Sequence, residues 1–166
     1  MTPAVLSDYR KLYAGDYMRG NWAWRASGLD ALMGGASRII EVGAGRGQLA
    51  RLMQSRGLDW QAFDPHPTTP WVERASLPTL PRDDRAYDLS VTVDVLEHIA
   101  PTDILRCLAE LRRVARRGAW AIANMSDVHL VDGVPTELHL IQQPAAWWTE
   151  QVRSIGGIAT VHRTDT

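Results

Sequence analysis

The fold is decided by the stretch RIIEVGAGRGQLARLM, which spans residues 38–53. Its first five residues form a largely apolar, β-branched run that stops at Gly43, as a buried strand does. From residue 48 onward, apolar residues recur on one face of a helix, and Gly57 ends that pattern. Glycines between a strand and a helix let a ligand lie against bare backbone. The stretch therefore predicts a ligand-binding loop, with a tight turn that binds nothing as the alternative.

The alternation of strand and helix continues along the rest of the chain. We expect two helices within residues 6–33 and a proline-bearing connection over residues 64–84. Further strands are expected at 60–63, 87–93, 120–124 and 158–163, and further helices at 48–56, 102–117 and 144–154. Strands separated by helical crossovers predict an α/β fold with a doubly wound, mostly parallel sheet. In such a sheet, ligands bind at the carboxyl ends of the strands.

The composition is that of an ordinary globular domain. The 166 residues carry 18 Lys and Arg against 19 Asp and Glu, and 45% of them are hydrophobic. This length predicts one domain, and the composition excludes a disordered chain. The single cysteine, Cys107, excludes an internal disulfide. The sequence has neither an apolar run of about 18 residues nor a signal-peptide pattern at its start, so we expect a cytoplasmic protein without a membrane partner.

The glycine loop does not follow the dinucleotide-binding pattern. That pattern needs Gly43, Gly45 and a small residue at position 48, which is Gln48 here. The acid Glu41 lies at the end of the preceding strand and suits a ligand with an ammonium group and no phosphate. Asp64 ends the next strand, where a carboxylate can accept both hydroxyl protons of a ribose. A helix N-cap is the alternative role for Asp64.

Three segments together resemble the class I S-adenosylmethionine-dependent methyltransferases. They are EVGAGRGQLARLM at 41–53, FDP at 63–65 and YDLSVTVDVLEHI at 87–99, and the resemblance covers roughly residues 37–163. It implies a Rossmann-like methyltransferase fold that is short at its C-terminus, with S-adenosyl-L-methionine as cofactor. The implied cofactor-binding residues are Glu41, Gly43, Ala44, Gly45, Gly47, Asp64, Pro65, Ser76, Leu77, Asp94 and Val95.

Two of these positions carry particular expectations. Ser76 stands where the family often has an aspartate that binds adenine, and one neutral hydrogen bond in place of a charged one would weaken cofactor binding by about 1 kcal/mol. Leu77 is expected to pack on the adenine face. Asp94 and Val95 are expected near the methionine portion of the cofactor. As a domain, the chain is expected to comprise N-terminal helices or a lid (1–36), a cofactor-binding core (37–124) and an acceptor-side loop, helix and last strand (125–166).

The candidate catalytic residues are His98 and His139. Methyl transfer from a sulfonium is an in-line displacement, so positioning carries much of the rate and an acceptor O–H or N–H needs at most a general base. His98 is the first candidate for that base, and a satisfied polar residue between strand and helix is the alternative. His139 lies in a segment that resembles the family's acceptor-side region, although a loop histidine is often a surface residue.

We expect the acceptor to be a small molecule that is methylated on oxygen or nitrogen. The N-terminal helices, with Tyr13, Tyr17 and Trp22 as a candidate lid, and the loop 125–143 are expected to build its pocket. Plain packing of an amphipathic helix is the alternative for the lid. A cofactor-binding module without turnover and a methyltransferase acting on nucleic acid remain as alternative functions, and Gln48 argues against a nicotinamide-dependent oxidoreductase.

Nucleic acid is the less favoured acceptor because the basic residues do not form an interleaved aromatic and basic surface. The one basic cluster, Arg112, Arg113, Arg116 and Arg117, is expected in the last turns of the helix 102–117. There, positive charge complements the carbonyl end of the helix, which explains the cluster without a partner. The sequence does not indicate an oligomeric state.

A metal ion is the last alternative at the acceptor side. Asp94, Glu97, His98 and His139 could together hold a divalent ion, as acidic residues and a histidine after the fourth strand do in the ubiquinone-pathway and small-RNA O-methyltransferases that this segment resembles. The same residues are also explained without metal. Asp94 can contact the cofactor, Glu97 can accept from free amides at the next helix, and His98 can act as base. We therefore expect no bound metal.

Overall fold

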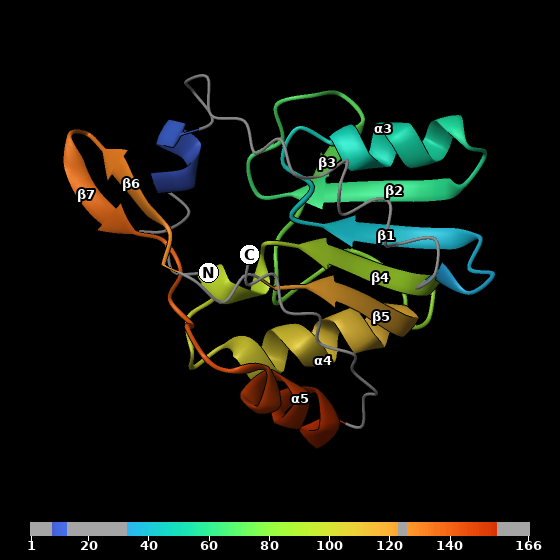
Figure 1. The fold of residues 1–166 in the computed structure, drawn as a ribbon. Coiled ribbons are helices and arrows are strands. Elements are labelled where there is room, and N and C mark those ends of the chain that lie inside the picture. The colour runs from blue at the N-terminus through green and yellow to red at the C-terminus, as the bar shows by residue number, and fades with distance from the viewer. Residues whose placement is uncertain (1–7, 13–32, 123–125, 156–166) are drawn as a thin grey trace.

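The computed structural model describes residues 8–12, 33–122 and 126–155 (Figure 1). Its main sheet has five parallel strands in the order β3-β2-β1-β4-β5. The strands are β1 (Arg38–Val42), β2 (Asp59–Asp64), β3 (Val72–Arg74), β4 (Tyr87–Val93) and β5 (Ala115–Ala121). The helices are α3 (Gln48–Ser55), the 3₁₀ helix η1 (Leu96–His98), α4 (Ile104–Val114) and α5 (Ala145–Ser154). The predicted α/β fold with a mostly parallel sheet is confirmed.

Helices cover both faces of this sheet. Adjacent residues of β1 point to opposite sides, so Ile39 packs in the core beneath α3 while Ile40 packs in the core beneath α4 and α5. Both side chains are fully buried. A parallel sheet that is covered on both faces needs such continuous apolar strands. The run of apolar residues at 38–42 therefore reflects two cores rather than one.

The central strand β1 is where the order of the strands reverses. It pairs with β2 on one side and with β4 on the other. Loops leaving two such neighbouring strands turn to opposite faces of the sheet and open a crevice between them. The carboxyl ends of β1, β2 and β4 are therefore the place to look for a site.

The structure differs from the sequence prediction over residues 64–84. This connection contains the short strand β3, which pairs only with β2 at the edge of the five-stranded sheet. Val72 is its one buried residue, while Glu73 and Arg74 are exposed. A strand with a single apolar side chain has no alternating pattern to detect, and charged residues are typical of sheet edges.

The boundary between α4 and β5 was also predicted wrongly. The helix ends at Val114 rather than at Arg117, and β5 runs from Ala115 to Ala121 rather than over 120–124. Arg116 and Arg117 therefore lie on a strand. The parallel ladder with β4, which begins at Ala115, outweighs the helical preference of these residues. Gly118 lies within this strand and does not end the helix. A glycine suits this position because a Cβ there would be 2.4 Å from the ring of Trp120.

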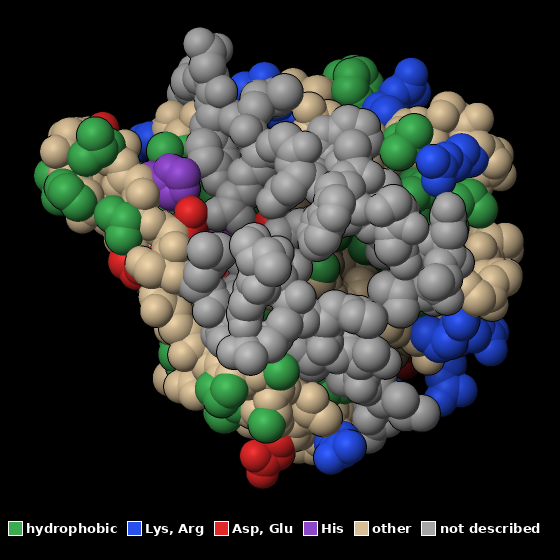
Figure 2. Space-filling view, viewed as in Figure 1, with side chains coloured by type: hydrophobic (Ala, Val, Ile, Leu, Met, Phe, Trp, Pro, Cys, Tyr) green, Lys and Arg blue, Asp and Glu red, His purple; other side chains and the backbone are tan. Residues whose placement is uncertain are grey.

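The segment predicted as an acceptor-side loop contains a two-stranded antiparallel hairpin. Its strands are β6 (Val128–Val131) and β7 (Val134–Glu137). Asp132 and Gly133 both have positive φ, 51° and 80°, which is the conformation of a tight two-residue hairpin turn. Figure 2 shows hydrophobic side chains on the outside of this hairpin. They include Val128, Leu130 and Val134, each more than half exposed.

Several predictions fall on residues that the structure does not describe. Residues 8–12 are helical, but the rest of the two helices expected at 6–33 lies outside the described ranges, except for residue 33. Tyr13, Tyr17 and Trp22 also lie outside them, as does the strand expected at 158–163. Within the described ranges, none of the helices has the length and apolar character that a membrane crossing requires.

Candidate functional site

The glycine loop between β1 and α3 starts with a residue that has to be glycine. Gly43 has a φ of 79°, which residues with a side chain rarely adopt. A Cβ at Gly43 would also lie 2.3 Å from Cγ2 of Val95. The amides of Gly43 and Ala44 both donate to the carbonyl oxygen of Phe63, at 2.8 and 3.0 Å. These bonds hold the loop against the end of β2.

Asp64 at the end of β2 links that strand to the loop. Its Oδ2 accepts from the amide of Gly45 and its Oδ1 from the amide of His66, both at 2.8 Å. The residue is 3% exposed. Burial raises the pKa of the Asp64 carboxyl, and the two amide bonds partly oppose this. The result is a buried carboxylate held in one orientation at the mouth of the loop.

Asp94 directly follows β4 and has a strained backbone. Its φ is 53°, in the left-handed region that few residues other than glycine adopt. The amide of Asp94 donates to the carbonyl of Ala121 at 3.1 Å, which ties this turn to β5. Strain of this kind persists only where the surroundings enforce it, and it is frequent at binding sites.

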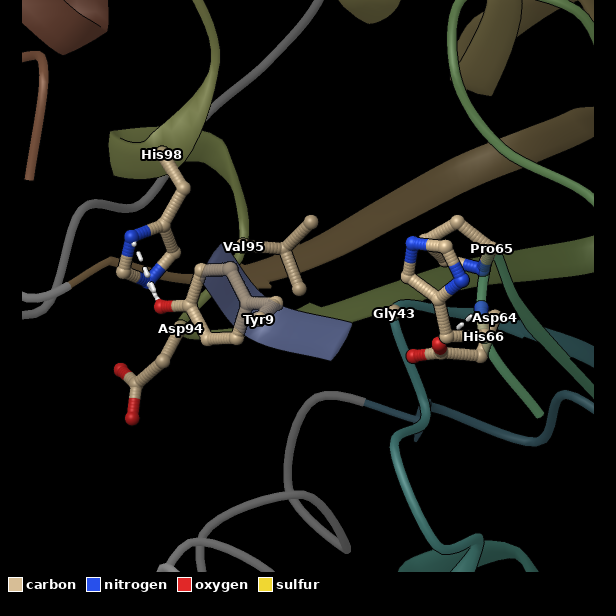
Figure 3. A pocket seen from close by; sticks show the side chains of 8 residues that line it. All are labelled: Tyr9, Gly43, Asp64, Pro65, His66, Asp94, Val95 and His98. Carbon is tan, nitrogen blue, oxygen red and sulfur yellow. Dashed lines mark hydrogen bonds between the residues drawn. The ribbon is translucent and has the colours of Figure 1, made fainter. Parts of the chain in front are cut away.

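These residues meet in one cavity (Figure 3). It encloses about 40 Å³. Its lining combines six residues that the sequence predicts and two that it does not. The predicted ones are Gly43, Asp64, Pro65, Asp94, Val95 and His98, and the added ones are Tyr9 and His66. Tyr9 belongs to the helical pattern expected within residues 6–33 but was not chosen as a site candidate, whereas His66 could have been found from its place two residues after Asp64.

His98 brings a buried imidazole to this cavity. It is 2% exposed, and its Nδ1 lies 2.8 Å from the carbonyl oxygen of Leu138. Because a carbonyl oxygen only accepts, Nδ1 carries a proton and donates it there. In the neutral ring, Nε2 then presents a lone pair. The Tyr9 hydroxyl oxygen lies 2.9 Å from Nε2 and 3.0 Å from Nδ1.

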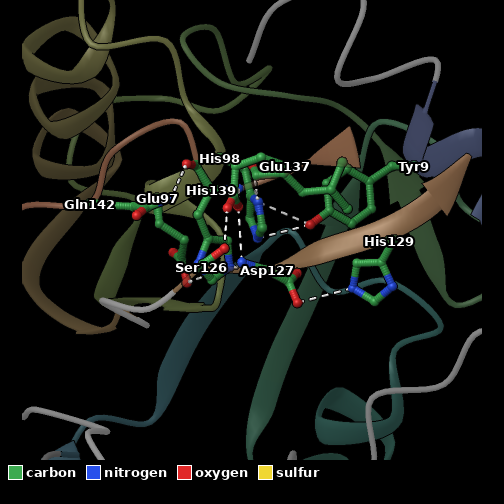
Figure 4. A network of polar contacts seen from close by, with 10 residues as sticks. Tyr9, Glu97, His98, Ser126, Asp127, His129, Glu137, His139 and Gln142 are labelled. Carbon is green, nitrogen blue, oxygen red and sulfur yellow. Dashed lines mark hydrogen bonds and ion pairs between the residues drawn. The ribbon is translucent and has the colours of Figure 1, made fainter. Parts of the chain in front are cut away.

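His139 does not line the cavity but lies beside His98 (Figure 4). The two rings meet edge to face with their centroids 4.6 Å apart. The Nε2 of His139 is 3.6 Å from an oxygen of Asp127 and 4.0 Å from an oxygen of Glu97. His139 is itself 2% exposed. The geometry therefore suits a residue that supports His98 better than one that reaches an acceptor.

Glu137 fixes the position of this histidine pair. It accepts from the amides of Asp127 and His139, both at 2.9 Å, and from the hydroxyl of Ser126. Although burial opposes the shift, these hydrogen bonds lower the pKa of Glu137 to about 2. The base of the β6–β7 hairpin is thus joined to the loop that carries Leu138 and His139.

The same cluster offers ligands for a metal ion. One ligand atom each from Glu97, His98 and His139 lies within 4.8 Å of the other two, and all three residues are buried. One carboxylate oxygen and two imidazole nitrogens suit zinc or manganese better than magnesium. The fourth candidate from the sequence, Asp94, is not part of this group. The expectation that no metal is bound stays a prediction.

The other predicted cofactor residues do not line this cavity. Oε2 of Glu41 accepts from the indole nitrogen of Trp60 at 2.8 Å, and burial raises the pKa of Glu41 to about 7. Leu77 is 8% exposed and belongs to the core beneath α4, next to Ser76 in a turn. Gly45 donates to Asp64, and Gly47 is the N-cap of α3.

The family model of the methyltransferase domain matches residues 16–164 of this chain. The chain belongs to the class I S-adenosylmethionine-dependent methyltransferase family. A methyltransferase of Mycobacterium tuberculosis, described as uncharacterized, is 32% identical over 115 residues. This match covers 63% of the present chain and 46% of the relative, so the chain spans about half the length of the curated relatives it matches.

Solved methyltransferases share the fold at low sequence identity. The 1,6-didemethyltoxoflavin-N1-methyltransferase of Burkholderia thailandensis, solved with its acceptor and S-adenosylhomocysteine, is 16% identical with a TM-score of 0.62, covering 92% of this chain and 72% of that one. An S-adenosylmethionine-dependent methyltransferase of Mesorhizobium loti is 17% identical with a TM-score of 0.57, covering 82% and 81%. At such identities the likeness establishes the fold alone.

The residues of this methyltransferase-family chain fit the cosubstrate that the family implies. S-adenosylmethionine carries a ribose diol, which needs an acceptor, and a methionine ammonium group, which needs a carboxylate. Asp64 offers a buried carboxylate in a fixed orientation. Asp94 offers a second carboxylate at another part of the same cavity. The cavity thus provides a hydrogen-bond acceptor for the ribose hydroxyls and a carboxylate for the ammonium group of S-adenosylmethionine.

Proposed function

We propose that this chain transfers the methyl group of S-adenosylmethionine to an oxygen or nitrogen of a small-molecule acceptor. The observation that carries the proposal is the cavity in which Asp64 and Asp94 lie together with the imidazole of His98. Two carboxylates suit the cosubstrate, and a buried imidazole suits proton removal from an acceptor. A cytoplasmic location is part of this proposal.

Five of the lining residues have a direct role in this scheme. Asp64 accepts the ribose hydroxyls, Asp94 pairs with the ammonium group, and Gly43 and Val95 shape the space between them. When bound, S-adenosylmethionine supplies an electrophilic methyl group on a sulfonium. His98 accepts the proton of the acceptor at Nε2, because its Nδ1 already donates to Leu138.

The remaining predicted residues act in support of this scheme. Pro65, Ser76 and Leu77 are proposed for the adenine side, and Glu41, Ala44, Gly45 and Gly47 for the shape of the loop. His139 stays in the proposal as a catalytic candidate through its contact with His98. The acceptor side is proposed to combine residues 1–36 with residues 125–166. The position of Tyr9 on the cavity supports this division.

A small-molecule acceptor is favoured by the site and by one relative. Among the described residues, the polar side chains that line the cavity are carboxylates, imidazoles and a phenol, without a Lys or Arg to neutralise phosphates. The Burkholderia thailandensis neighbour is a methyltransferase of a small heterocycle. A nucleic acid acceptor and a binding module without turnover are the alternatives, which methylated product on an acceptor panel would distinguish.

Calorimetric titration with S-adenosylmethionine tests the cosubstrate assignment. Asp64→Asn keeps the shape of the side chain but loses its charge, so we expect affinity to fall by about 10- to 100-fold. Asp88→Asn is the matched control, since Asp88 also accepts from two backbone amides, those of Ser37 and Arg38, but lies outside the cavity. Equal affinities in all three proteins would remove Asp64 from the site.

A further inference from the structure

The phenol of Tyr9 lies at the part of the cavity that His98 lines. It lines the same cavity as Gly43, Asp64 and Asp94, yet it comes from the N-terminal helical segment 8–12. Its hydroxyl oxygen is 2.9 Å from Nε2 and 3.0 Å from Nδ1 of His98, so it lies over the imidazole ring, close to both nitrogens. In Figure 3 the hydroxyl of Tyr9 points at the imidazole of His98, with Asp94 beside them.

The hydrogen bonds of His98 define what this phenol does. Because Nδ1 donates to Leu138, the neutral ring can only accept at Nε2, so the hydroxyl of Tyr9 is the donor. The rings lie nearly perpendicular, at 80° with centroids 5.0 Å apart. Such an edge-to-face contact selects a flat aromatic group as well as a hydroxyl. The space beside His98 therefore accommodates an aromatic ring that carries an O–H.

The segment that carries Tyr9 is also held by a contact at the surface. Lys11 forms an ion pair with Asp132, which lies in the turn of the β6–β7 hairpin. Both side chains are well exposed, at 46% and 68%. Exposed ion pairs of this kind contribute little to stability. The ion pair therefore opposes a movement of Tyr9 away from His98 only weakly.

We propose that Tyr9 occupies the place of the reacting group, and that the acceptor of this chain is a phenol-like aromatic hydroxyl compound that displaces it. The inference rests on the proposed function and narrows it to O-methylation of aromatic hydroxyls. The acceptor repeats the two contacts of Tyr9, a hydroxyl within hydrogen-bond distance of Nε2 of His98 and an aromatic ring that meets the imidazole edge to face. Tyr9 therefore blocks this place until an aromatic hydroxyl compound that binds His98 more tightly than Tyr9 does displaces it.

The reaction balances with the groups already named. The acceptor oxygen forms a bond to the methyl carbon, while the carbon–sulfur bond breaks and leaves its electron pair on sulfur. The proton of the hydroxyl passes to Nε2 of His98. One positive charge thus leaves the sulfonium and one appears on the imidazolium, so no further reactant is required.

Phenol itself is the probe for this proposal. Tyr9→Ala removes the phenol group of the side chain and leaves a residue that favours a helix. We expect calorimetry or ligand-detected NMR to show phenol binding to Tyr9→Ala at least about tenfold more tightly than to the wild type, the equivalent of one hydrogen bond. Tyr9→Phe is the matched control, because its ring still fills the space. Phenol should bind Tyr9→Phe no better than the wild type.

Two further comparisons complete the test. Toluene, which lacks the hydroxyl, should bind Tyr9→Ala more weakly than phenol, and the double variant Tyr9→Ala, His98→Ala should lose this preference. With S-adenosylmethionine present, Tyr9→Ala should convert phenol to anisole. Phenol binding without anisole in a variant that does bind S-adenosylmethionine, or no gain in phenol binding, would overturn the proposal. A wild type that does not bind S-adenosylmethionine would instead overturn the proposed function, because phenol binding is measured without it.

Discussion

Glu41 is a buried acid whose ionisation opposes folding. Burial raises its pKa to about 7, above the usual value of 4.5, although the hydrogen bond from Trp60 favours the charged form. Between these two pH values the unfolded chain releases the proton while the folded chain retains it. The contribution of Glu41 to stability is therefore largest below pH 4.5, falls as the pH rises and is constant above about 7.

Glu41→Gln should remove this dependence on pH. The neutral amide keeps an oxygen for Trp60, so the variant should match the wild type near pH 4.5 and exceed its free energy of unfolding at pH 8 by about 3 kcal/mol. Urea unfolding at the two pH values measures the difference. Trp60→Phe, which removes a donor to the carboxylate, should move the fall in stability to higher pH. An unchanged pH profile in Glu41→Gln would contradict this account.

Asp94 illustrates strain kept for binding. With its φ at 53°, Asp94→Gly should relieve the backbone and keep or raise the melting temperature, while S-adenosylmethionine binds at least about tenfold more weakly. Arg85 has a similar φ of 55° but lies outside the cavity. Arg85→Gly should therefore raise stability by about 1 kcal/mol without changing affinity. Equal effects of the two variants on binding would show that Asp94 has no contact with the cosubstrate.

At the level of single elements, the turn of the β6–β7 hairpin is the most easily tested. Gly133 has a φ of 80°, and a Cβ there would touch nothing within 4 Å, so Gly133→Ala adds backbone strain alone. We expect a local cost of about 1–2 kcal/mol. Hydrogen exchange should accelerate in β6 and β7 and stay unchanged in β1 and β4. Gly57→Ala, at a similar φ of 83° before β2, is the control and should leave the hairpin protected.

The sequence predicted those elements whose patterns are local. The strands β1, β2 and β4, the helix α3 and the loop residues Gly43 and Asp64 all follow from apolar runs and glycine positions. The edge strand β3 and the start of β5 at Ala115 depend on pairing with distant strands, which no local pattern encodes. The hairpin is different, because Asp132-Gly133 is a strong turn signal that was available in the sequence.

Some residues of the cavity could be predicted from local sequence patterns, and others could not. Its cofactor side was predicted because the residues stand at the ends of strands that a parallel sheet brings together. Tyr9 could not be predicted, since its contact with His98 joins parts of the chain that are 89 residues apart. His98 and His139 were predicted as two separate catalytic candidates, and together only as possible ligands in the metal alternative. The contact between the two histidines depends on the hydrogen bonds of Glu137, which fix the loop that carries His139.

For the molecule as a whole, ligand binding should raise the free energy of unfolding. A ligand that binds only the folded chain at 100 times its dissociation constant adds about 2.7 kcal/mol. For a chain of this size we expect S-adenosylhomocysteine to raise the melting temperature by roughly 5–10 °C. NAD at the same concentration is the control and should cause no shift, because Gln48 breaks the dinucleotide pattern. If NAD raised the melting temperature and S-adenosylhomocysteine did not, the chain would bind a dinucleotide and not the methyltransferase cosubstrate.

The all-parallel strand order also sets a sequence of events during synthesis. The β1–α3–β2 unit, with its glycine loop and Asp64, can form as soon as residues 38–64 have emerged, because Arg38 pairs with Asp59 nearby in the chain. The other neighbour of β1 must wait until Leu89 reaches Ile39. Pairings between distant residues form slowly. One edge of the half-built sheet therefore stays open to other chains during translation, and a nascent chain halted before residue 87 should be the species that aggregates or recruits a chaperone.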